Sequence, residues 1–487
     1  MHGRLVERVA LLIALAFVLV VAGVATAQAP APELAEFRAI YQELVEINTT
    51  DSVGDTAKAA QAMAARLKAA GFPGADVQVL SSAPRKGNLV ARLRGSGGGK
   101  PLLLLAHLDV VEARREDWSF DPFTLTEKDG YFYGRGTIDD KAMAAIFVDT
   151  FMRLKREAFV PQRDLILALT ADEELGASSK NNGVRWLLAN HRNLIDAELA
   201  INEGGGGELR DGRHVVLRVQ TSEKVPVNFR LQVTNKGGHS SRPERDNAIY
   251  RLAEGLARLG KFDFPFALNE TTRAFFERSA DQRQRPDLMR AILRTPPDAE
   301  ALALLSQDSG FNALGRTTCV ATRLEGGHAN NALPQMARAV VNCRILPGER
   351  PEDVQRTIAR VLADDQITVT PTSVFIASPP SPLEPRLMGH VERLTKAMYP
   401  GALVLPTMST GATDGRFLRN AGIPTYGVSG IFTDAGDNRT HGRDERYRDQ
   451  RPLRRPRVPA RPRESARLRR LSGARSYTVG APWRRAD

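Results

Sequence analysis

The chain has 487 residues, of which 42% are hydrophobic and 25% are charged, and its formal net charge is +12. At roughly 100–200 residues per domain, this length predicts two or three domains that each bury a hydrophobic core. The two cysteines exclude a disulfide-rich scaffold and a cysteine-rich zinc module. The charge is unevenly spread, because 13 arginines but only three acids lie in residues 447–487, and the rest of the chain is nearly neutral.

Residues 1–27 have the pattern of an export signal. Arg4 and Arg8 precede an unbroken run of apolar residues and glycine at 9–24, and Ala25-Thr26-Ala27 is a small-residue cleavage site. We therefore expect export to the periplasm or the medium, with cleavage near Ala27. The alternative is a membrane anchor, although the apolar run is shorter than the roughly 20 residues that a helix needs to span a bilayer.

Predicted helices and strands alternate through residues 33–221. Helical spacing of apolar residues extends from Glu33 to Gly71, with a break at Thr50 and Asp51. Further along the chain we expect apolar strands at 88–93, 101–106, 164–170 and 197–202, and helices at 143–154 and 183–190. Buried strands that alternate with helices indicate an α/β fold with a mixed, mostly parallel sheet covered by helices on both faces.

The pattern changes near Ser222, where half-exposed strands replace the buried ones. A βαββα order with such strands predicts a smaller α+β domain at residues 222–373, inserted into the first domain. This domain carries a polar, partly helical insertion at 262–311, and the first domain resumes at 374–446. The predicted strands of the inserted domain lie at 225–233, 317–324 and 337–346, and its helices at 247–259 and 351–363.

Residues 447–487 are rich in arginine and proline and have no apolar periodicity. A shifted reading frame in a GC-rich gene yields such sequence, and we expect a frame shift at about Tyr447. The alternative is a basic arm that binds nucleic acid or an anionic surface. Because the rest of the chain is nearly neutral, we expect no nucleic-acid partner.

Acidic residues and histidines follow the predicted strands at the points where functional side chains collect in open α/β sheets. Acids that converge in one cleft repel one another unless cations neutralise them. Histidine and carboxylate side chains are suitable zinc ligands. The residues at these positions are His107, Asp109, Asp139, Glu173, Glu174, Glu203 and His441.

Other chemistries have less support in the sequence. No G-x-S-x-G elbow, phosphate-binding loop or G-x-G-x-x-G turn after a strand is found. Cys319 and Cys343 lie on adjacent predicted strands with no base nearby, which favours buried packing over nucleophilic use. A disulfide formed after export is the alternative that the sequence leaves open.

Together these motifs resemble those of the co-catalytic di-zinc aminoacylase and carboxypeptidase family, which includes glutamate carboxypeptidase and acetylornithine deacetylase. The resemblance covers about residues 34–446. The segments WSFDPF at 118–123, GRGTIDDK at 134–141 and NEGGG at 202–206 are most similar to the carboxypeptidase S-like branch. In the family a final strand and an amphipathic helix follow the last histidine, where this chain has its arginine–proline segment.

The resemblance implies a role for each residue of the set. Two Zn²⁺ ions, which Co²⁺ or Mn²⁺ could replace, would be held by His107, Asp139, Glu174, Glu203 and His441, with Asp139 bridging both ions and followed by a cis peptide. Glu173 would be the general base, and Asp109 would orient His107. From the inserted domain, which serves as lid and dimerisation domain, His239 would reach the substrate carbonyl, and Asn331 and Arg344 would contact the substrate.

The function that the resemblance implies is amide hydrolysis by an exported metal-dependent enzyme. Its substrate would be a small peptide or an N-acyl amino acid, and a zinc-bridging hydroxide activated by Glu173 would attack the amide. Two alternatives remain open: a zinc-binding pseudoenzyme, and an inactive frame-shifted product of the same fold.

Overall fold

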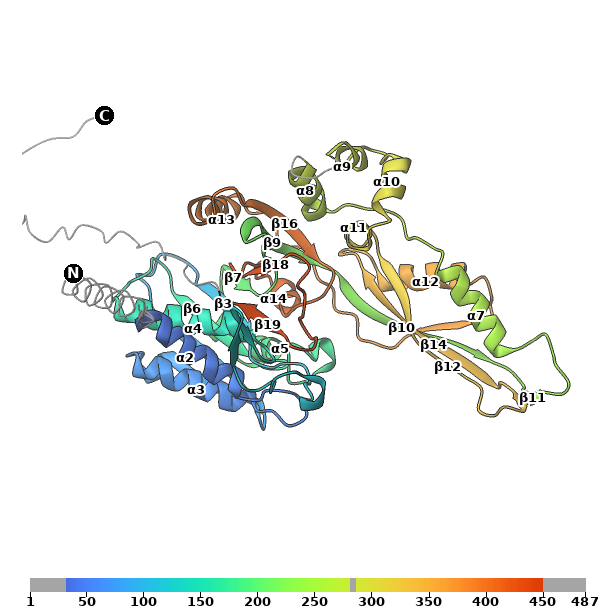
Figure 1. Cartoon of the computed structure of the whole chain (residues 1–487), viewed down its shortest axis with the longest axis horizontal. Coiled ribbons are helices and arrows are strands. Elements are labelled where there is room, and N and C mark those ends of the chain that lie inside the picture. Colours follow the sequence, from blue (N-terminus) through green and yellow to red (C-terminus); the bar gives the residue numbers. More distant parts are fainter. Residues whose placement is uncertain (1–31, 281–285, 450–487) are drawn as a thin grey trace, which may run out of the picture. The chain divides into compact units, whose positions relative to one another are not determined.

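The computed structural model describes residues 32–280 and 286–449 (Figure 1). The predicted export signal, its alternative as an anchor, and residues 450–487 of the arginine-rich segment lie outside the described residues. Across the two described ranges, no helix is both long and apolar enough to cross a membrane.

The larger sheet contains ten strands in the order β1-β2-β6-β3-β7-β17-β9-β8-β18, with β16 also paired to β9. Strands β6, β3, β7 and β17 run parallel to one another, whereas β1, β2, β8 and β9 make antiparallel pairs. The prediction of a mixed, largely parallel sheet is therefore confirmed. In sheet order the strands are Val77–Ala83, Lys86–Leu93, Leu165–Thr170, Leu102–His107, Leu199–Asn202, Thr425–Gly427, Arg213–Glu223, Gly206–Arg210 and Phe432–Asp434, with β16 at Leu403–Ser409.

Helices cover both faces of this sheet. Successive side chains of a strand point to opposite sides, so the buried apolar strands present apolar residues to both helix layers. Leu167 and Leu169 of β6 pack in one core with α2 (Pro32–Glu46), α3 (Thr56–Ala69) and α4 (Lys141–Arg156). Ile166 and Ala168 pack in the opposite core. The helices of that second layer are α5 (Gly183–Asn190), α6 (Arg192–Ile195) and α14 (Gly415–Asn420), and α13 (Pro385–Met398) packs in a further core with β16 and β9.

The second sheet has four antiparallel strands in the order β12-β14-β10-β15. Alternate residues of β14 are buried beneath α7 (Ala248–Leu259) and α12 (Pro351–Leu362), which gives the inserted α+β architecture expected from the sequence. The strands are β12 (Thr318–Gly326), β14 (Met336–Ile345), β10 (Val225–Thr234) and β15 (Thr368–Pro371).

The polar insertion forms four short helices with a core of their own. Phe275 and Phe276 pack there with Leu405 of β16, so the insertion also covers part of the larger sheet. The helices are α8 (Glu270–Ser279), α9 (Pro286–Ile292), α10 (Ala299–Leu305) and α11 (Ser309–Gly315).

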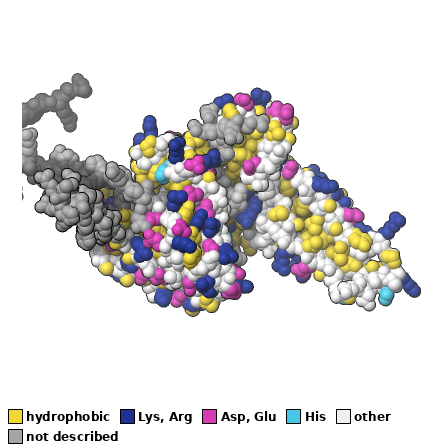
Figure 2. Space-filling model, in the orientation of Figure 1, with side chains coloured by type: hydrophobic (Ala, Val, Ile, Leu, Met, Phe, Trp, Pro, Cys, Tyr) yellow, Lys and Arg dark blue, Asp and Glu magenta, His cyan; other side chains and the backbone are white. Residues whose placement is uncertain are grey.

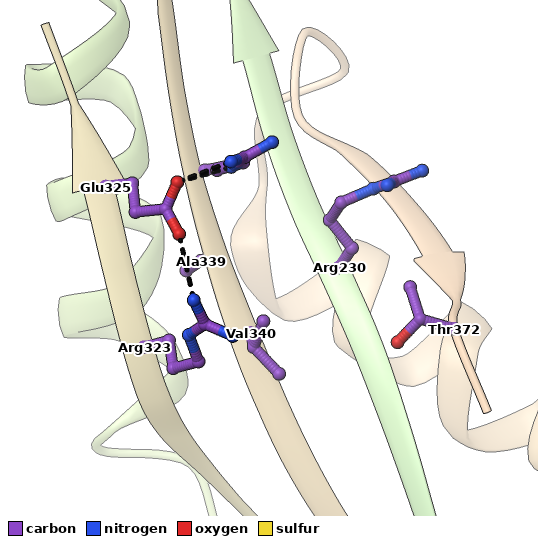
Figure 3. A pocket seen from close by; sticks show the side chains of 7 residues that line it. Arg230, Arg323, Glu325, Ala339, Val340 and Thr372 are labelled. Carbon is purple, nitrogen blue, oxygen red and sulfur yellow. Dashed lines mark hydrogen bonds and ion pairs between the residues drawn. The ribbon is translucent and has the colours of Figure 1, made fainter. Parts of the chain in front are cut away.

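The face of the second sheet opposite its helices is polar. A cavity of about 250 Å³ on this face is lined by Arg230, Arg323, Glu325, Arg338, Ala339, Val340 and Thr372 (Figure 3). Glu325 pairs with both Arg323 and Arg338, so its carboxylate neutralises part of the positive charge. On the same sheet, Cys319 and Cys343 are direct cross-strand partners and form a disulfide, which was the pairing that the sequence left open.

A small three-stranded sheet pairs the last described strand with a hairpin from the first third of the chain. It consists of β4 (Thr126–Lys128), β5 (Tyr131–Tyr133) and β19 (Arg446–Arg448). Tyr447 is buried in the core of α2, α3 and α4, with its ring 5.9 Å from that of Tyr41. Packed structure therefore continues through the first residues of the segment that the sequence assigns to the arginine-rich tail.

Candidate metal centre

Three adjacent parallel strands place polar side chains at one edge of the larger sheet. Strand β3 ends at His107 and lies between β6, which leads into Glu173 and Glu174, and β7, which leads into Glu203. Because the carboxyl ends of parallel strands meet at the same edge, residues far apart in sequence converge here. The strand-end pattern in the sequence anticipated this convergence.

Asp139 connects the two histidines. Its Oδ1 lies 3.0 Å from His107 Nε2, and its Oδ2 lies 3.1 Å from His441 Nε2. Asp139 immediately precedes Asp140 at the start of α4, whereas His441 lies in the loop between β18 and β19. The Asp139–Asp140 peptide bond is cis, as the family resemblance implies. One carboxylate with an imidazole on each oxygen has the arrangement of a ligand that bridges two cations.

A second carboxylate flanks each imidazole. Glu174 Oε2 lies 3.0 Å from His441 Nε2, and Glu203 Oε2 lies 3.8 Å from His107 Nε2. Ligand atoms of His107, Asp139 and Glu174 lie within 4.8 Å of one another, as do those of His107, Glu173 and Glu203. We refer to His107, Asp139, Glu174, Glu203 and His441 as the ligand cluster.

The electrostatics of the ligand cluster are those of a cation site. Burial raises the pKa of Glu203, whose buried Oε1 atom has no hydrogen-bond partner among the described residues. Hydrogen bonds to Asp139 and Glu174 raise the pKa of His441 to about 10, so the surrounding carboxylates favour a positive charge at this position. Imidazole and carboxylate donors around a bridging carboxylate fit a pair of divalent ions.

Glu173 is buried beside the ligand cluster. Burial, followed by the nearby charge of Glu203, raises the pKa of its carboxyl group well above the usual range. Its backbone N–H and that of Glu174 donate to the two carboxylate oxygens of Asp109, at 3.1 and 3.0 Å. The Asp109 carboxylate thus fixes the turn that carries both glutamates.

Asp109 also contacts His107, although mainly through its backbone. The Nδ1 atom of His107 lies 3.0 Å from the carbonyl oxygen of Asp109 and 3.7 Å from its Oδ1. A ring nitrogen held by a carbonyl leaves the other nitrogen, Nε2, free to face a metal ion. The orientation of His107 that the resemblance implies therefore involves the main chain of Asp109.

Sequence reasoning missed one acid behind Glu173. Asp414 is buried at the start of α14, and its Oδ1 accepts a 2.6 Å hydrogen bond from Asn182 Nδ2. The same Asn182 nitrogen donates to the carbonyl oxygen of Asp172 at 3.1 Å, so Asp414 supports the turn before Glu173. Burial raises the pKa of Asp414 to about 7. Its only local signal is an acid between two glycines, Gly411 and Gly415, after an apolar strand.

The sequence of residues 103–455 matches Peptidase family M20/M25/M40. The chain belongs to this family. Its members are metal-dependent peptidases and related hydrolases, and the ligand cluster lies within the matched residues.

Two proteins with similar sequences carry different names. The human N-fatty-acyl-amino acid synthase/hydrolase PM20D1 is 29% identical over 357 residues, which cover 71% of this chain and 70% of that protein. The probable carboxypeptidase S-like 2 of Dictyostelium discoideum is 30% identical over 366 residues, with 71% and 68% covered.

The fold agrees with that of a solved M20 structure. The M20 family metallo-carboxypeptidase Sso-CP2 from Sulfolobus solfataricus superposes with a TM-score of 0.62 at 18% sequence identity. The match covers 86% of this chain and 95% of that one, so it includes both sheets.

The remaining predicted site residues of this M20 chain lie on the second sheet and its tip. His239 on β11 (Gly238–His239) is exposed, and its Nδ1 lies 2.7 Å from Ser241 Oγ. The carbonyl oxygen of Asn331 accepts a hydrogen bond from Ser240 N at 3.0 Å, so Asn331 adjoins His239. Arg344 is half-buried on β14, and burial lowers its pKa. In the described part of the chain, no hydrogen bond or ion pair joins these three residues to the ligand cluster.

Proposed function

We propose that this M20 protein is an exported enzyme that hydrolyses the amide bond of N-acyl amino acids or small peptides with two Zn²⁺ ions. The observation that carries this proposal is the Asp139 carboxylate, which contacts one imidazole through each of its oxygens. A further carboxylate beside each imidazole makes two equivalent sets of donors around a shared ligand.

His107, Asp139 and Glu203 would hold one ion, and His441, Asp139 and Glu174 the other. These donors carry three carboxylates for two divalent cations, which leaves a net positive site that attracts a carbonyl oxygen and water. The bound ions would lower the pKa of a shared water toward about 7 and polarise the substrate carbonyl.

We assign the base to Glu173, whose carboxylate lies with the ligand atoms of His107 and Glu203 within 4.8 Å and is not needed in either of the two sets above. It takes a proton from the attacking water as the new C–O bond forms. It then passes this proton to the amide nitrogen as the C–N bond breaks, so that one free amine and one carboxylate leave. The raised pKa of Glu173 suits both the acceptance and the return of a proton.

Two features support a substrate with a free carboxylate next to the amide. The relatives include an N-fatty-acyl-amino acid synthase/hydrolase and a probable carboxypeptidase S-like protein, and hydrolysis by either activity would release an amino acid. The Arg344 guanidinium donates to Asn342 Oδ1 at 3.3 Å and has no carboxylate partner among the described residues, and a guanidinium recognises a carboxylate through paired hydrogen bonds.

The test is a substrate panel run on full-length protein after its zinc content has been measured. The panel contains N-acyl amino acids with short and long acyl chains, dipeptides, and the same compounds with the carboxylate amidated. We expect only the zinc-loaded protein to release free amino acid from the substrates. The amidated compounds should be turned over poorly. Zinc-loaded protein that leaves every compound intact would support the pseudoenzyme or the frame-shifted product instead.

We also propose that the second domain forms a homodimer. Strand β12 is an edge strand, and edge strands present unpaired backbone groups to other chains. Ile249, Tyr250 and Leu324 are exposed on α7 and β12, and Figure 2 shows hydrophobic side chains gathered over these elements.

Light scattering of the purified protein tests the dimer. We expect a dimeric mass for the natural chain and a monomeric mass for Leu324→Arg. The matched control is Val374→Arg, which adds the same charge at an exposed apolar residue outside this surface. A monomeric natural chain contradicts the proposal.

Export is tested separately by fractionation of the cells that make the protein. Protein in the periplasm or medium that begins near Gln28 supports cleavage after Ala27. Membrane-bound protein with an intact N-terminus supports the anchor.

A further inference from the structure

A fully buried carboxylate lies four residues after His441. The side chain of Glu445 is 0% exposed, and it accepts a hydrogen bond at 2.5 Å from the Arg135 guanidinium. It also accepts from three backbone N–H groups of the glycine turn that leads to the bridging ligand. These donors are the backbone N–H groups of Gly136 at 3.2 Å, Ile138 at 2.9 Å and Asp139 at 3.2 Å.

These contacts join the two loops that carry the bridging ligand and the last histidine. One donor to Glu445 is the amide of Asp139 itself, whose carboxylate contacts both imidazoles. Arg135 completes the connection, because its Nη2 donates to the carbonyl oxygens of His441 at 3.3 Å and of Gly442 at 3.2 Å. The backbone N–H of Gly134 donates in turn to the carbonyl oxygen of Glu445 at 3.1 Å.

The number of donors matches what a carboxylate can accept. An ionised carboxylate is an acceptor only, with about four lone-pair sites, and Glu445 has four donors. A glutamine of the same shape would turn an NH₂ group toward at least one of these donors and leave that donor unpaired. A buried ion pair by itself is weak evidence for stabilisation, since apolar residues of similar volume often replace such pairs without loss. The function of this carboxylate is therefore inferred from the backbone N–H groups that it binds.

We propose that Glu445 is a positioning residue that fixes Asp139 relative to His441 and thereby sets the affinity of the protein for its metal ions. This inference rests on the metal site of the proposed function, although it concerns metal binding and not amide hydrolysis. Glu445 touches no ligand atom. It acts through the backbone of Asp139 and, by way of Arg135, through the backbone of His441.

The chain contains a matched comparison for this role. Glu223 is also 0% exposed and is paired at 2.6 Å with Arg419, which is 4% exposed, and it accepts a backbone hydrogen bond from Thr413 at 3.1 Å. Glu223 contacts no backbone group of the ligand cluster. If buried carboxylates of this kind only stabilise the core, Glu445→Gln and Glu223→Gln will have the same effects.

The first experiment measures amide hydrogen exchange in metal-free protein. We expect Glu445→Gln to accelerate exchange in peptides that cover residues 134–140 and 439–446, because the NH₂ group of glutamine leaves at least one of the three amides without its acceptor. Glu223→Gln should leave the exchange of these peptides unchanged. Equal exchange of both loops in Glu445→Gln and the natural chain would overturn the proposal.

The second experiment measures Zn²⁺ affinity by competition with a chelator. Loss of a residue that supports metal ligands typically weakens affinity or activity by about 10–100-fold, and we expect a loss in this range for Glu445→Gln. The affinity of Glu223→Gln should stay within about twofold of the natural value, even if both variants unfold at a lower temperature. Unchanged affinity in Glu445→Gln would contradict the positioning role of Glu445. An equal loss of affinity in Glu445→Gln and Glu223→Gln would contradict it as well.

A further variant covers the case in which Glu445→Gln does not fold. Arg135→Lys keeps a positive charge beside Glu445 but cannot reach two carbonyls at once, so we expect a smaller loss of affinity. Natural affinity in Arg135→Lys would then overturn the proposal. Natural protein that binds zinc but hydrolyses no amide would contradict the proposed function alone, whereas natural protein that binds no zinc would contradict both.

Discussion

The ligand cluster and the tip of the second domain differ in how firmly their residues are held. His107 is 2% exposed and has defined partners on both ring nitrogens, which are the Asp109 carbonyl and the Asp139 carboxylate. His239 is exposed, and among the described residues its ring is hydrogen-bonded to its close neighbour Ser241 alone. The side chains of the ligand cluster are therefore already held by contacts within the protein. At the tip of the second domain, the His239 side chain is open to solvent.

This difference matches the tasks that the two regions have in the proposed function. A metal site needs its donors fixed within fractions of an ångström, and buried supporting contacts supply that precision. Residues that contact a variable substrate gain from exposure, since they must release the product. Four predictions test this contrast, beginning with the largest effect.

The largest effect is expected at Glu173. Glu173→Ala should lower kcat by about 10²–10⁴-fold, the usual contribution of a general base, while zinc content stays at the natural value. Steady-state kinetics and metal analysis of the same sample measure both quantities. A matched control is the exposed Glu157→Ala on the same domain. Loss of zinc together with activity would place Glu173 among the metal ligands and would contradict its assignment as the general base.

His239→Ala should come next. Loss of one group that stabilises an oxyanion costs about 10²–10³-fold in kcat, and an exposed side chain contributes little to folding. We therefore expect slower turnover with unchanged zinc affinity and unchanged melting temperature. Ser241→Ala, which removes only the neighbour of the imidazole, should have a smaller effect on the same assay. Full activity of His239→Ala would show that the tip takes no part in catalysis.

The disulfide should affect only the second domain. Replacing both cysteines, as in Cys319→Ala with Cys343→Ala, should lower the free energy of unfolding by about 3 kcal/mol, as expected for a loop of this size. The two residues are 24 positions apart and cross-link neighbouring strands. Denaturant unfolding measures the loss, and zinc affinity should not change. Unchanged stability would indicate that the bond is not formed in solution.

The smallest effect concerns Lys224, which lies between β9 of the larger sheet and β10 of the second. Burial lowers its pKa from 10.5 to about 7. Since the unfolded chain then binds more protons between pH 7 and pH 10.5, stability rises with pH across this range, and below pH 7 the full cost of the buried charge is present. Lys224→Met should therefore be more stable than the natural chain by at least about 1.4 kcal/mol at pH 6, the value of one pKa unit.

Urea unfolding at pH 6 and pH 10 measures this difference. The advantage of Lys224→Met should shrink at pH 10. The exposed Lys236→Met is the control that should show no such pH dependence. Equal stability of Lys224→Met and the natural chain at pH 6 would mean that the junction accommodates a charge without cost.

Local signals were enough to predict strands β2, β3, β6 and β7 of the larger sheet and to place acids and histidines at the strand ends, whereas β1, β8, β9, β16 and β18 were not predicted. Apolar runs marked β3, β6 and β7, and the end of a strand is a position that a single sequence reveals. For this reason His107, Glu173 and Glu203 could be placed at one edge before the sheet order was known. The cis peptide after Asp139 followed from the resemblance alone.

Features that depend on distant contacts could not be read from the sequence. Strand β9 was missed because its last residues are polar yet buried, with Thr221 bonded to Thr271 and Glu223 to Arg419. Asp414 and Glu445 were missed for the same reason, since the partners of their carboxylates, an amide, a guanidinium and backbone N–H groups, are more than two hundred positions away. The cysteine pairing needed the register of β12 on β14.

The strand β19 has a consequence for how the protein is made. Arg135 and Glu445 are 310 positions apart, and the loop with His441 is held between β18 and β19 near the end of the described chain. During synthesis, most of the larger sheet emerges long before the last histidine does. Before His441 is synthesised, the nascent chain therefore carries one proposed set of donors in full and two of the three members of the other. If the proposed two-metal centre forms, its loading would consequently follow synthesis of nearly all of the larger sheet.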